Sequence, residues 1–162
     1  MKELQAIADS MLPLFDNMPP VRIRFGTFYE VGPMTSGFYQ NGTIIIRDDA
    51  YEKDSPDTVR DTIKHEMIHA WVDWKAKTDP KYREHVDKHS EPFFIKAALI
   101  GFRDNFSWTA REENCYRHAK AIVEKRSTFL IKGSDWPIAA DRMKWRDLVP
   151  FEWQGPDVIW KR

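Results

Sequence analysis

The stretch HEMIHAW, residues 65–71, decides the fold because it predicts one helix with two different faces. His65 and His69 are four residues apart, and residues at that spacing lie one above the other on the same face of a helix. The opposite face carries an apolar stripe that would dock the helix on a core: Ile63, Met67, Ala70, Trp71 and Trp74. The stretch therefore predicts a helix that is buried on one side and carries chemistry on the other.

The same stretch matches the H-E-x-x-H pattern of zinc hydrolases. Two histidines one turn apart can aim their ring nitrogens at one metal ion, and Glu66 is close enough to face a water on that ion without binding the ion itself. Zinc lowers the pKa of such a water toward neutrality, and the carboxylate can take its proton. We therefore predict a single catalytic Zn²⁺ held by His65 and His69, with Glu66 as the general base.

A catalytic zinc ion usually has three protein ligands and one open position, so a third ligand is needed. His89 opens the segment HSEPFF, directly before an apolar helical pattern that would anchor it. His85 lies in a polar stretch, where a histidine at the surface is expected. Spacing and composition leave the choice open among these candidates: His85, His89, Glu91, and Glu112 or Glu113.

HEMIHAW followed by KHSEPFF, residues 88–94, resembles the SprT-like (Spartan-related) zinc metalloprotease family. In this family the histidine that opens a segment of the type H-G-x-x-F/W is the third zinc ligand. The resemblance, which covers about residues 20–102, implies His65, His69 and His89 as ligands and Glu66 as general base. It also implies a zincin-like core and an endopeptidase that cleaves DNA-bound or crosslinked proteins. Ser90 stands where the family usually has glycine.

Two other kinds of metalloenzyme use the same helix motif. The segment EENCYRHA, residues 112–119, faintly resembles the helix that supplies a glutamate ligand in IrrE-like peptidases, in which Glu112 or Glu113 would replace His89. Peptide deformylases take a cysteine ligand from a position ahead of the helix, whereas Cys115 lies behind it, so that class is excluded. Cys115 itself is expected to be a small buried hydrophobic residue.

The segments around this helix predict an α+β fold: a zincin-like core with a small antiparallel sheet packed on the H-E-x-x-H helix, and further helices. Residues 3–15 have an amphipathic helical pattern with Leu4, Ile7, Met11 and Leu14 on the apolar side. Residues 21–25 alternate as a half-buried strand. Two further strand patterns are joined by Asn41-Gly42, the strongest short hairpin signal. Helices are expected from about Pro56 to Lys75, over residues 91–102 and over residues 111–126.

The chain length indicates a single domain over residues 1–162, in which residues 1–110 form the metalloprotease core. Residues 111–162 would add a helix and a tryptophan-rich, mildly basic extension. In it Arg142, Lys144, Trp145 and Arg146 combine cations with aromatic rings, which suits a phosphate backbone and stacked bases. These four residues are therefore candidate nucleic-acid contacts.

Bulk properties narrow the class of protein. The net charge is zero, so DNA or an anionic membrane would have to be held by a local patch. A single cysteine cannot form a disulfide framework or the C-terminal zinc ribbon of many SprT-like proteins. No signal peptide or membrane-length apolar run is recognisable, so a cytoplasmic protein that does not enter a membrane is expected.

The function predicted is zinc-dependent hydrolysis of a protein or peptide substrate, with DNA as a candidate partner. We expect the substrate to lie extended along the strand near residues 43–47, where a sheet edge would offer main-chain hydrogen bonds. Tyr39 and Tyr116 are candidates for stabilising the oxyanion. A DNA-associated binding module with a non-catalytic metal site is the alternative from a different class. A third alternative is an effector or phage-encoded factor directed at one host protein.

Overall fold

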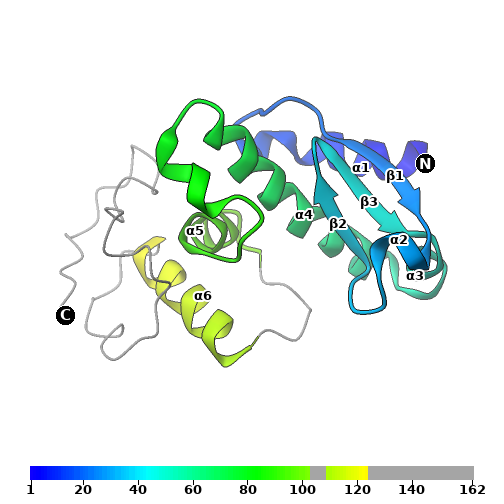
Figure 1. The fold of residues 1–162 in the computed structure, drawn as a ribbon. Coiled ribbons are helices and arrows are strands. Elements are labelled where there is room, and N and C mark those ends of the chain that lie inside the picture. Colours follow the sequence, from blue (N-terminus) through cyan, green and yellow to red (C-terminus); the bar gives the residue numbers. More distant parts are fainter. Residues whose placement is uncertain (103–108, 124–162) are drawn as a thin grey trace. The chain divides into compact units, whose positions relative to one another are not determined.

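The computed structural model describes residues 1–102 and 109–123. These residues form several helices and one three-stranded sheet, so the class is α+β as predicted (Figure 1). The chain divides into two compact units, Met1–Pro80 and Lys81–Arg162. The single domain with its core at residues 1–110 stays a prediction. Among the described residues no helix combines the length and apolarity that crossing a membrane requires.

The first unit contains eight elements in the order helix, strand, helix, hairpin and two helices, with one 3₁₀ turn after the first helix. They are α1 (Lys2–Met11), η1 (Leu12–Phe15), β1 (Arg22–Gly26), α2 (Phe28–Val31), β2 (Gly37–Gln40), β3 (Thr43–Arg47), α3 (Asp48–Lys53) and α4 (Pro56–Ala76). The sequence patterns did not predict α2 or α3. Both are short, and α3 follows β3 without an intervening loop.

The sheet has the strand order β1-β3-β2 and is mixed. The predicted hairpin is confirmed: β2 and β3 are antiparallel, and Asn41 and Gly42 turn the chain with φ angles of 48° and 79°. The predicted antiparallel arrangement holds for this pair but not for the whole sheet, because β1 pairs with β3 in parallel. After β1 the chain passes through α2 and enters β2 beyond the place of β3. The returning β3 therefore fits between β1 and β2, and it runs in the direction of β1.

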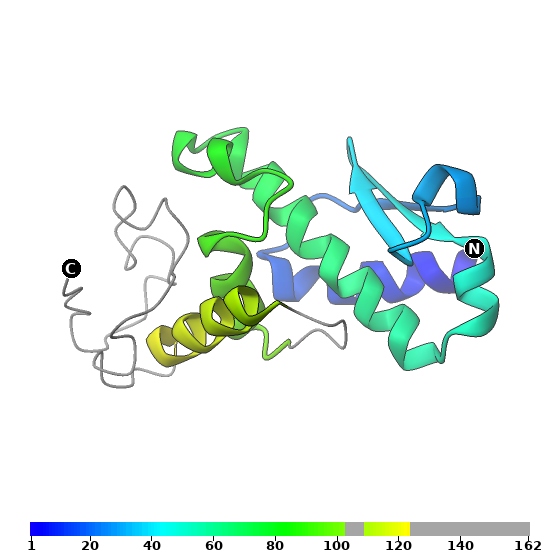
Figure 2. The same cartoon turned by 60° about the horizontal axis from the view of Figure 1, so that its bottom comes forward.

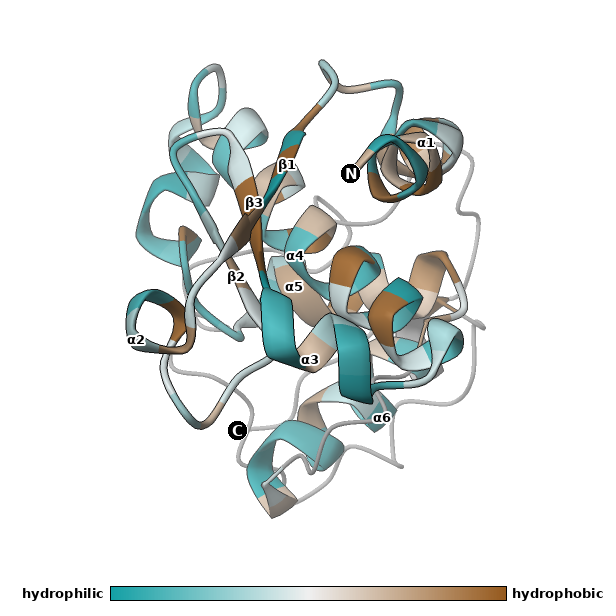
Figure 3. Ribbon diagram, turned by 90° about the vertical axis from the view of Figure 1, so that its right-hand side faces the viewer, coloured by the Kyte–Doolittle hydropathy of each residue, from teal (hydrophilic) through white to brown (hydrophobic). Residues whose placement is uncertain are grey.

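The central strand β3 is the apolar centre of the first unit. Its three isoleucines, Ile44, Ile45 and Ile46, are at most 2% exposed. Figure 3 shows this strand as a brown, hydrophobic ribbon between its two neighbours. In β1 the exposed Arg22 and Arg24 flank the buried Ile23, which confirms the predicted alternation.

Helix α4 begins with the predicted cap and spans the first unit. The Ser55 hydroxyl accepts a hydrogen bond from the backbone N–H of Thr58 at 3.2 Å, and Pro56 occupies the first turn. The helix contacts β2, β3, α1 and η1, and Figure 2 shows α1 lying beside it. The predicted packing of the sheet on the H-E-x-x-H helix is therefore confirmed. A hydrogen bond connects α4 to the hairpin: the Tyr39 hydroxyl donates to Asp73 Oδ2 at 2.6 Å.

The opening helix differs from its predicted pattern at its end. Leu14 was expected on the buried stripe but is 43% exposed, whereas Phe15 is fully buried. The reason is the change from α1 to the 3₁₀ turn η1, which contains Pro13 and has three residues per turn instead of 3.6. The change of period brings Phe15, rather than Leu14, onto the buried side.

In the second unit the helices α5 (Glu91–Leu99) and α6 (Ala110–Val123) pack against each other. The apolar side chains between residues 93 and 97 are completely buried: Phe93, Phe94, Ile95 and Ala97. Helix α6 contributes Cys115, Tyr116 and Ala119, which are also buried. The 3₁₀ helix η2 (Pro80–His85) forms in the polar stretch where a loop or short helical turn was predicted. Both helices predicted after residue 90 are thus present as far as residue 123.

Candidate metal centre

The polar face of α4 is buried nearly as well as its apolar face. His65 and His69 are 9% and 8% exposed, and their ring centroids lie 5.1 Å apart. Glu66 is 7% exposed, and its Oε1 lies 3.9 Å from His65 Nε2. A chance H-E-x-x-H on an ordinary helix would be expected to leave these polar side chains in solvent. Their burial favours a site over an incidental pattern.

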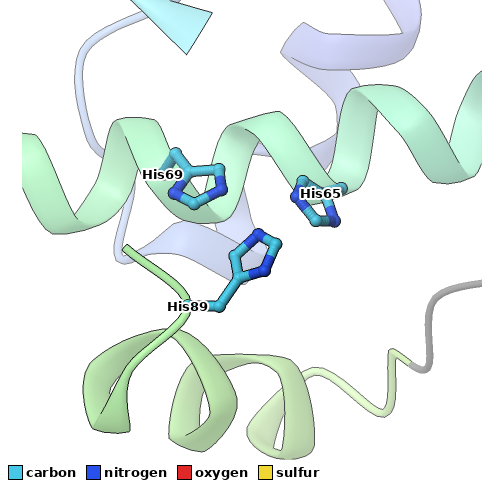
Figure 4. A group of neighbouring side chains, drawn as sticks. All are labelled: His65, His69 and His89. Carbon is cyan, nitrogen blue, oxygen red and sulfur yellow. The ribbon is translucent and has the colours of Figure 1, made fainter. Parts of the chain in front are cut away.

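His89 joins these two residues in a group of three. One ring nitrogen from each of His65, His69 and His89 lies within 4.8 Å of the others. Figure 4 shows the three imidazole rings gathered together, two of them from successive turns of one helix. The other sequence candidates for a third ligand do not belong to this group: His85, Glu91, Glu112 and Glu113.

The donor set fits a transition-metal ion. Neutral imidazole suits zinc, copper, iron and nickel, whereas magnesium and calcium prefer oxygen ligands. Nitrogens bound about 2.0–2.1 Å from a tetrahedral zinc ion lie roughly 3.4 Å apart, which is within the 4.8 Å that limits the separations in this group. Three protein ligands would also leave a fourth position open. The three histidines can therefore hold one metal ion.

His89 is held by two neighbours from its own unit. Its Nδ1 lies 2.7 Å from Glu112 Oε2, and its ring centroid lies 4.6 Å from that of Phe93. Partial burial acts to raise the pKa of Glu112, but its hydrogen bonds with the backbone and side chain of Thr109 and its contact with His89 lower it by more in total. The pKa of Glu112 is therefore lowered, and the residue carries its charge beside His89.

His85 corrects a prediction, because it is not the surface histidine that its polar surroundings indicated. It is 2% exposed, and its Nδ1 lies 2.7 Å from Ser90 Oγ and 3.4 Å from Glu91 Oε2. Burial lowers the pKa of His85 and raises the pKa of Glu91 to about 7. The charged residues Lys81, Arg83 and Glu84 lie nearby in sequence, so the segment was expected to be exposed. The burial of His85 depends on how the second unit packs, which these neighbours do not indicate.

The remaining candidates fall into three groups. Tyr39 is bonded to Asp73, so its hydroxyl has a structural partner, and Tyr116 is 7% exposed within α6. Cys115 is 1% exposed and burial raises its pKa to about 12, which confirms it as a buried hydrophobic residue rather than a nucleophile. The four candidate nucleic-acid contacts lie outside the described residues: Arg142, Lys144, Trp145 and Arg146.

Comparison with known proteins gives no relative: no protein-family model matches the chain, and neither curated proteins nor solved structures give a significant match. The resemblance to SprT-like proteases therefore rests on the sequence, chiefly on HEMIHAW and KHSEPFF.

Proposed function

We propose that this protein is a zinc-dependent endopeptidase of the SprT-like type, with a zincin-like core. The observation that carries the proposal is the group of three histidines with Glu66 next to His65. Structural zinc sites commonly use four protein ligands, often cysteines, whereas three ligands with an open position are typical of catalytic sites. A carboxylate beside the group is what hydrolysis requires in addition.

The chain's own residues would share the work of peptide hydrolysis. A zinc ion bound by His65, His69 and His89 would polarise the scissile carbonyl and make a water acidic enough to lose its proton near neutral pH. Glu66 takes that proton as the water oxygen bonds to the carbonyl carbon. It then passes the proton to the nitrogen of the peptide as the C–N bond breaks. The burial of Glu66 keeps bulk water away from this transfer.

The expected path of the substrate along residues 43–47 needs correction. Strand β3 is paired on both sides, with β1 and with β2, so its main-chain groups are already in use. Within the described residues β2 is an edge strand, and it contacts α4, which carries Glu66. We therefore place the extended substrate along β2, Gly37–Gln40, where main-chain hydrogen bonds would bind a peptide with little regard to its sequence.

The IrrE-like alternative has less support. It requires Glu112 or Glu113 as the third ligand, but Glu112 bonds His89 and stands outside the three-histidine group. Cleavage of DNA-bound or crosslinked proteins stays a proposal that rests on the resemblance. A DNA-associated binding module would bind metal through the same histidines but would not cleave proteins. A substitution of Glu66 distinguishes the two functions, because only the enzyme needs this carboxylate as a general base.

The test is cleavage by the zinc-loaded wild type and by Glu66→Gln. The substrates are a denatured protein and a protein crosslinked to DNA, each with and without added DNA. Loss of the general base should reduce cleavage by about 10²–10⁴-fold while one zinc per chain is retained. Glu84→Gln, which changes an exposed carboxylate in the second unit, is the matched control and should cleave normally. No cleavage by the wild type under any of these conditions would overturn the endopeptidase and favour the binding module.

A further inference from the structure

We propose that Glu112 is a positioning residue that fixes the ring of His89 for metal binding, an inference that rests on the proposed function. Both residues belong to the second unit, and their side chains are in direct contact at 2.7 Å. The sequence offered Glu112 as a rival to His89 for the third ligand position. The geometry points to a different role for Glu112, which would affect metal binding indirectly, through its contact with His89.

The carboxylate of Glu112 is itself fixed by the start of α6. Its Oε1 accepts a hydrogen bond from the backbone N–H of Thr109 at 3.1 Å. In return the backbone N–H of Glu112 donates to Thr109 Oγ1 at 3.2 Å. This reciprocal pair is a capping box, in which both partners satisfy amides that the first turn of a helix leaves without an internal acceptor. One oxygen of Glu112 is thus committed to the helix, and the other is aimed at His89.

The second oxygen selects the tautomer of His89. The 2.7 Å contact pairs Nδ1 of His89 with a carboxylate oxygen, and a carboxylate in the ionised form that is ordinary near neutral pH only accepts hydrogen bonds, so Nδ1 is the donor. In a neutral imidazole the other nitrogen, Nε2, then carries the lone pair that a metal ion needs. The ring of Phe93 at 4.6 Å restricts the same imidazole from a second direction. His89 would therefore be set in tautomer and orientation before any metal binds.

The expected effect has a definite size. Carboxylates that hold a metal-binding histidine in this way typically contribute 10- to 100-fold to metal affinity. The side chains of His89 and Glu112 are 35% and 23% exposed, so water competes with their hydrogen bond. We therefore expect Glu112→Ala to weaken zinc binding by about tenfold, at the lower end of that range. Glu112→Gln, which keeps an acceptor oxygen but no charge, should weaken it less.

The experiment measures zinc affinity by competition with a chelator for the full chain and its variants. Thr109→Ala is the matched control, because it removes the hydroxyl half of the capping box and leaves the contact between Glu112 and His89. It should lower the unfolding temperature without changing zinc affinity. In a His89→Ala background, Glu112→Ala should cause no further loss of affinity, since Glu112 would act through that ring.

A second readout needs no metal and no activity. Nitrogen-15 NMR of the imidazole of His89 in the metal-free protein reports which ring nitrogen is protonated. The wild type should show the Nδ1–H tautomer, and Glu112→Ala should lose that preference. A purely structural role of Glu112 at the start of α6 would leave the tautomer of His89 unchanged.

The outcomes separate this inference from the proposed function. If the wild type binds zinc and His89→Ala weakens it, but Glu112→Ala changes neither affinity nor tautomer, the role of Glu112 is overturned and the enzyme stands. Equal losses of affinity in Thr109→Ala and Glu112→Ala would also overturn it, because helix capping alone would then explain them. If the wild type binds no zinc, the proposed function and the role of Glu112 fall together.

Discussion

Two pairs of histidines in this chain share a four-residue spacing but differ in environment. His65 and His69 lie on one face of α4 with their rings 5.1 Å apart. His85 and His89 have different partners: His85 contacts Ser90 in a buried position, and His89 contacts Glu112 at a partly exposed one. Spacing in the sequence predicts proximity only where the backbone between the residues is known.

The backbone accounts for the difference between the pairs. The first pair is joined by continuous α-helix, in which a four-residue step is close to one turn. In the second pair, η2 ends at His85 and the chain turns through Asp87, whose φ of 59° is in the left-handed region. That turn breaks the helical period, so the two rings take up separate environments. The first pair can share a metal ion, whereas only His89 of the second pair joins them.

Removing one member of each pair gives the largest predicted contrast. His69→Ala should weaken zinc binding on the order of a thousandfold, because apparent zinc-binding energies of about 10–16 kcal/mol are shared among three or four ligands. His85→Ala should leave the affinity unchanged. Chelator competition measures both values. A large loss in His85→Ala, with a small loss in His69→Ala, would reverse the assignment.

The fifth histidine, His118, sharpens the comparison through pH. Burial lowers its pKa from 6.5 to about 4, so between these values the unfolded chain binds a proton that the folded chain does not. Stability that His118 contributes above pH 6.5 is therefore lost as the pH falls toward 4. The difference between wild type and His118→Gln should change by roughly 3 kcal/mol at most across that range.

Urea unfolding of the metal-free wild type and His118→Gln, from pH 7.5 to pH 4, measures this effect. The stability of the variant should fall less steeply than that of the wild type. Parallel curves would show that His118 has the same proton affinity in the folded and unfolded chain, against its assignment as a buried neutral histidine.

His85 should contribute more than His89 to the stability of the metal-free protein. His85→Ala would empty a fully buried position and leave Ser90 and Glu91 without the imidazole, at a cost of about 2 kcal/mol. His89→Ala removes a partly exposed ring and should cost less in the metal-free protein. Urea unfolding in the presence of a chelator compares them. Equal costs would contradict the division between a structural and a ligand histidine.

The smallest predicted effect concerns the N-terminal cap of α4, the helix that carries His65 and His69. Ser55→Ala removes the acceptor for the Thr58 N–H and should destabilise the protein by about 1 kcal/mol. Because α4 is long and packed along much of its length, the register of His65 and His69 should not change. Thermal unfolding measures the cost, and zinc stoichiometry is its control. Loss of zinc in this variant would mean that the site depends on the start of the helix.

Local sequence signals predicted much of the first unit. The cap at Ser55 and the hairpin at Asn41-Gly42 depend on residues close together in the chain, and both are present. Of the predicted apolar stripe of α4, Ile63, Met67, Ala70 and Trp71 are buried, whereas Trp74 is only half-buried. The parallel pairing of β1 with β3 was missed because it joins segments about twenty residues apart. No local pattern encodes the side of a hairpin on which a distant strand pairs.

In the candidate site, too, local sequence signals predicted some features, whereas features that depend on tertiary packing were missed. The helix period was enough to put His65 and His69 on one face, but His89 was selected by resemblance and not by spacing. The burial of His85 and the bond from Glu112 to His89 could not be predicted, because both depend on how η2, α5 and α6 pack. One local signal for Glu112 was present in the sequence: Thr109 and Glu112 have the spacing of a capping box.

Zinc content per chain in the wild type and in His89→Ala, after extensive dialysis at neutral pH, tests the central claim most directly. The account predicts one zinc ion per wild-type chain and a large loss in His89→Ala, while His85→Ala retains the metal. One zinc ion per chain in His89→Ala, bound as tightly as in the wild type, would contradict it.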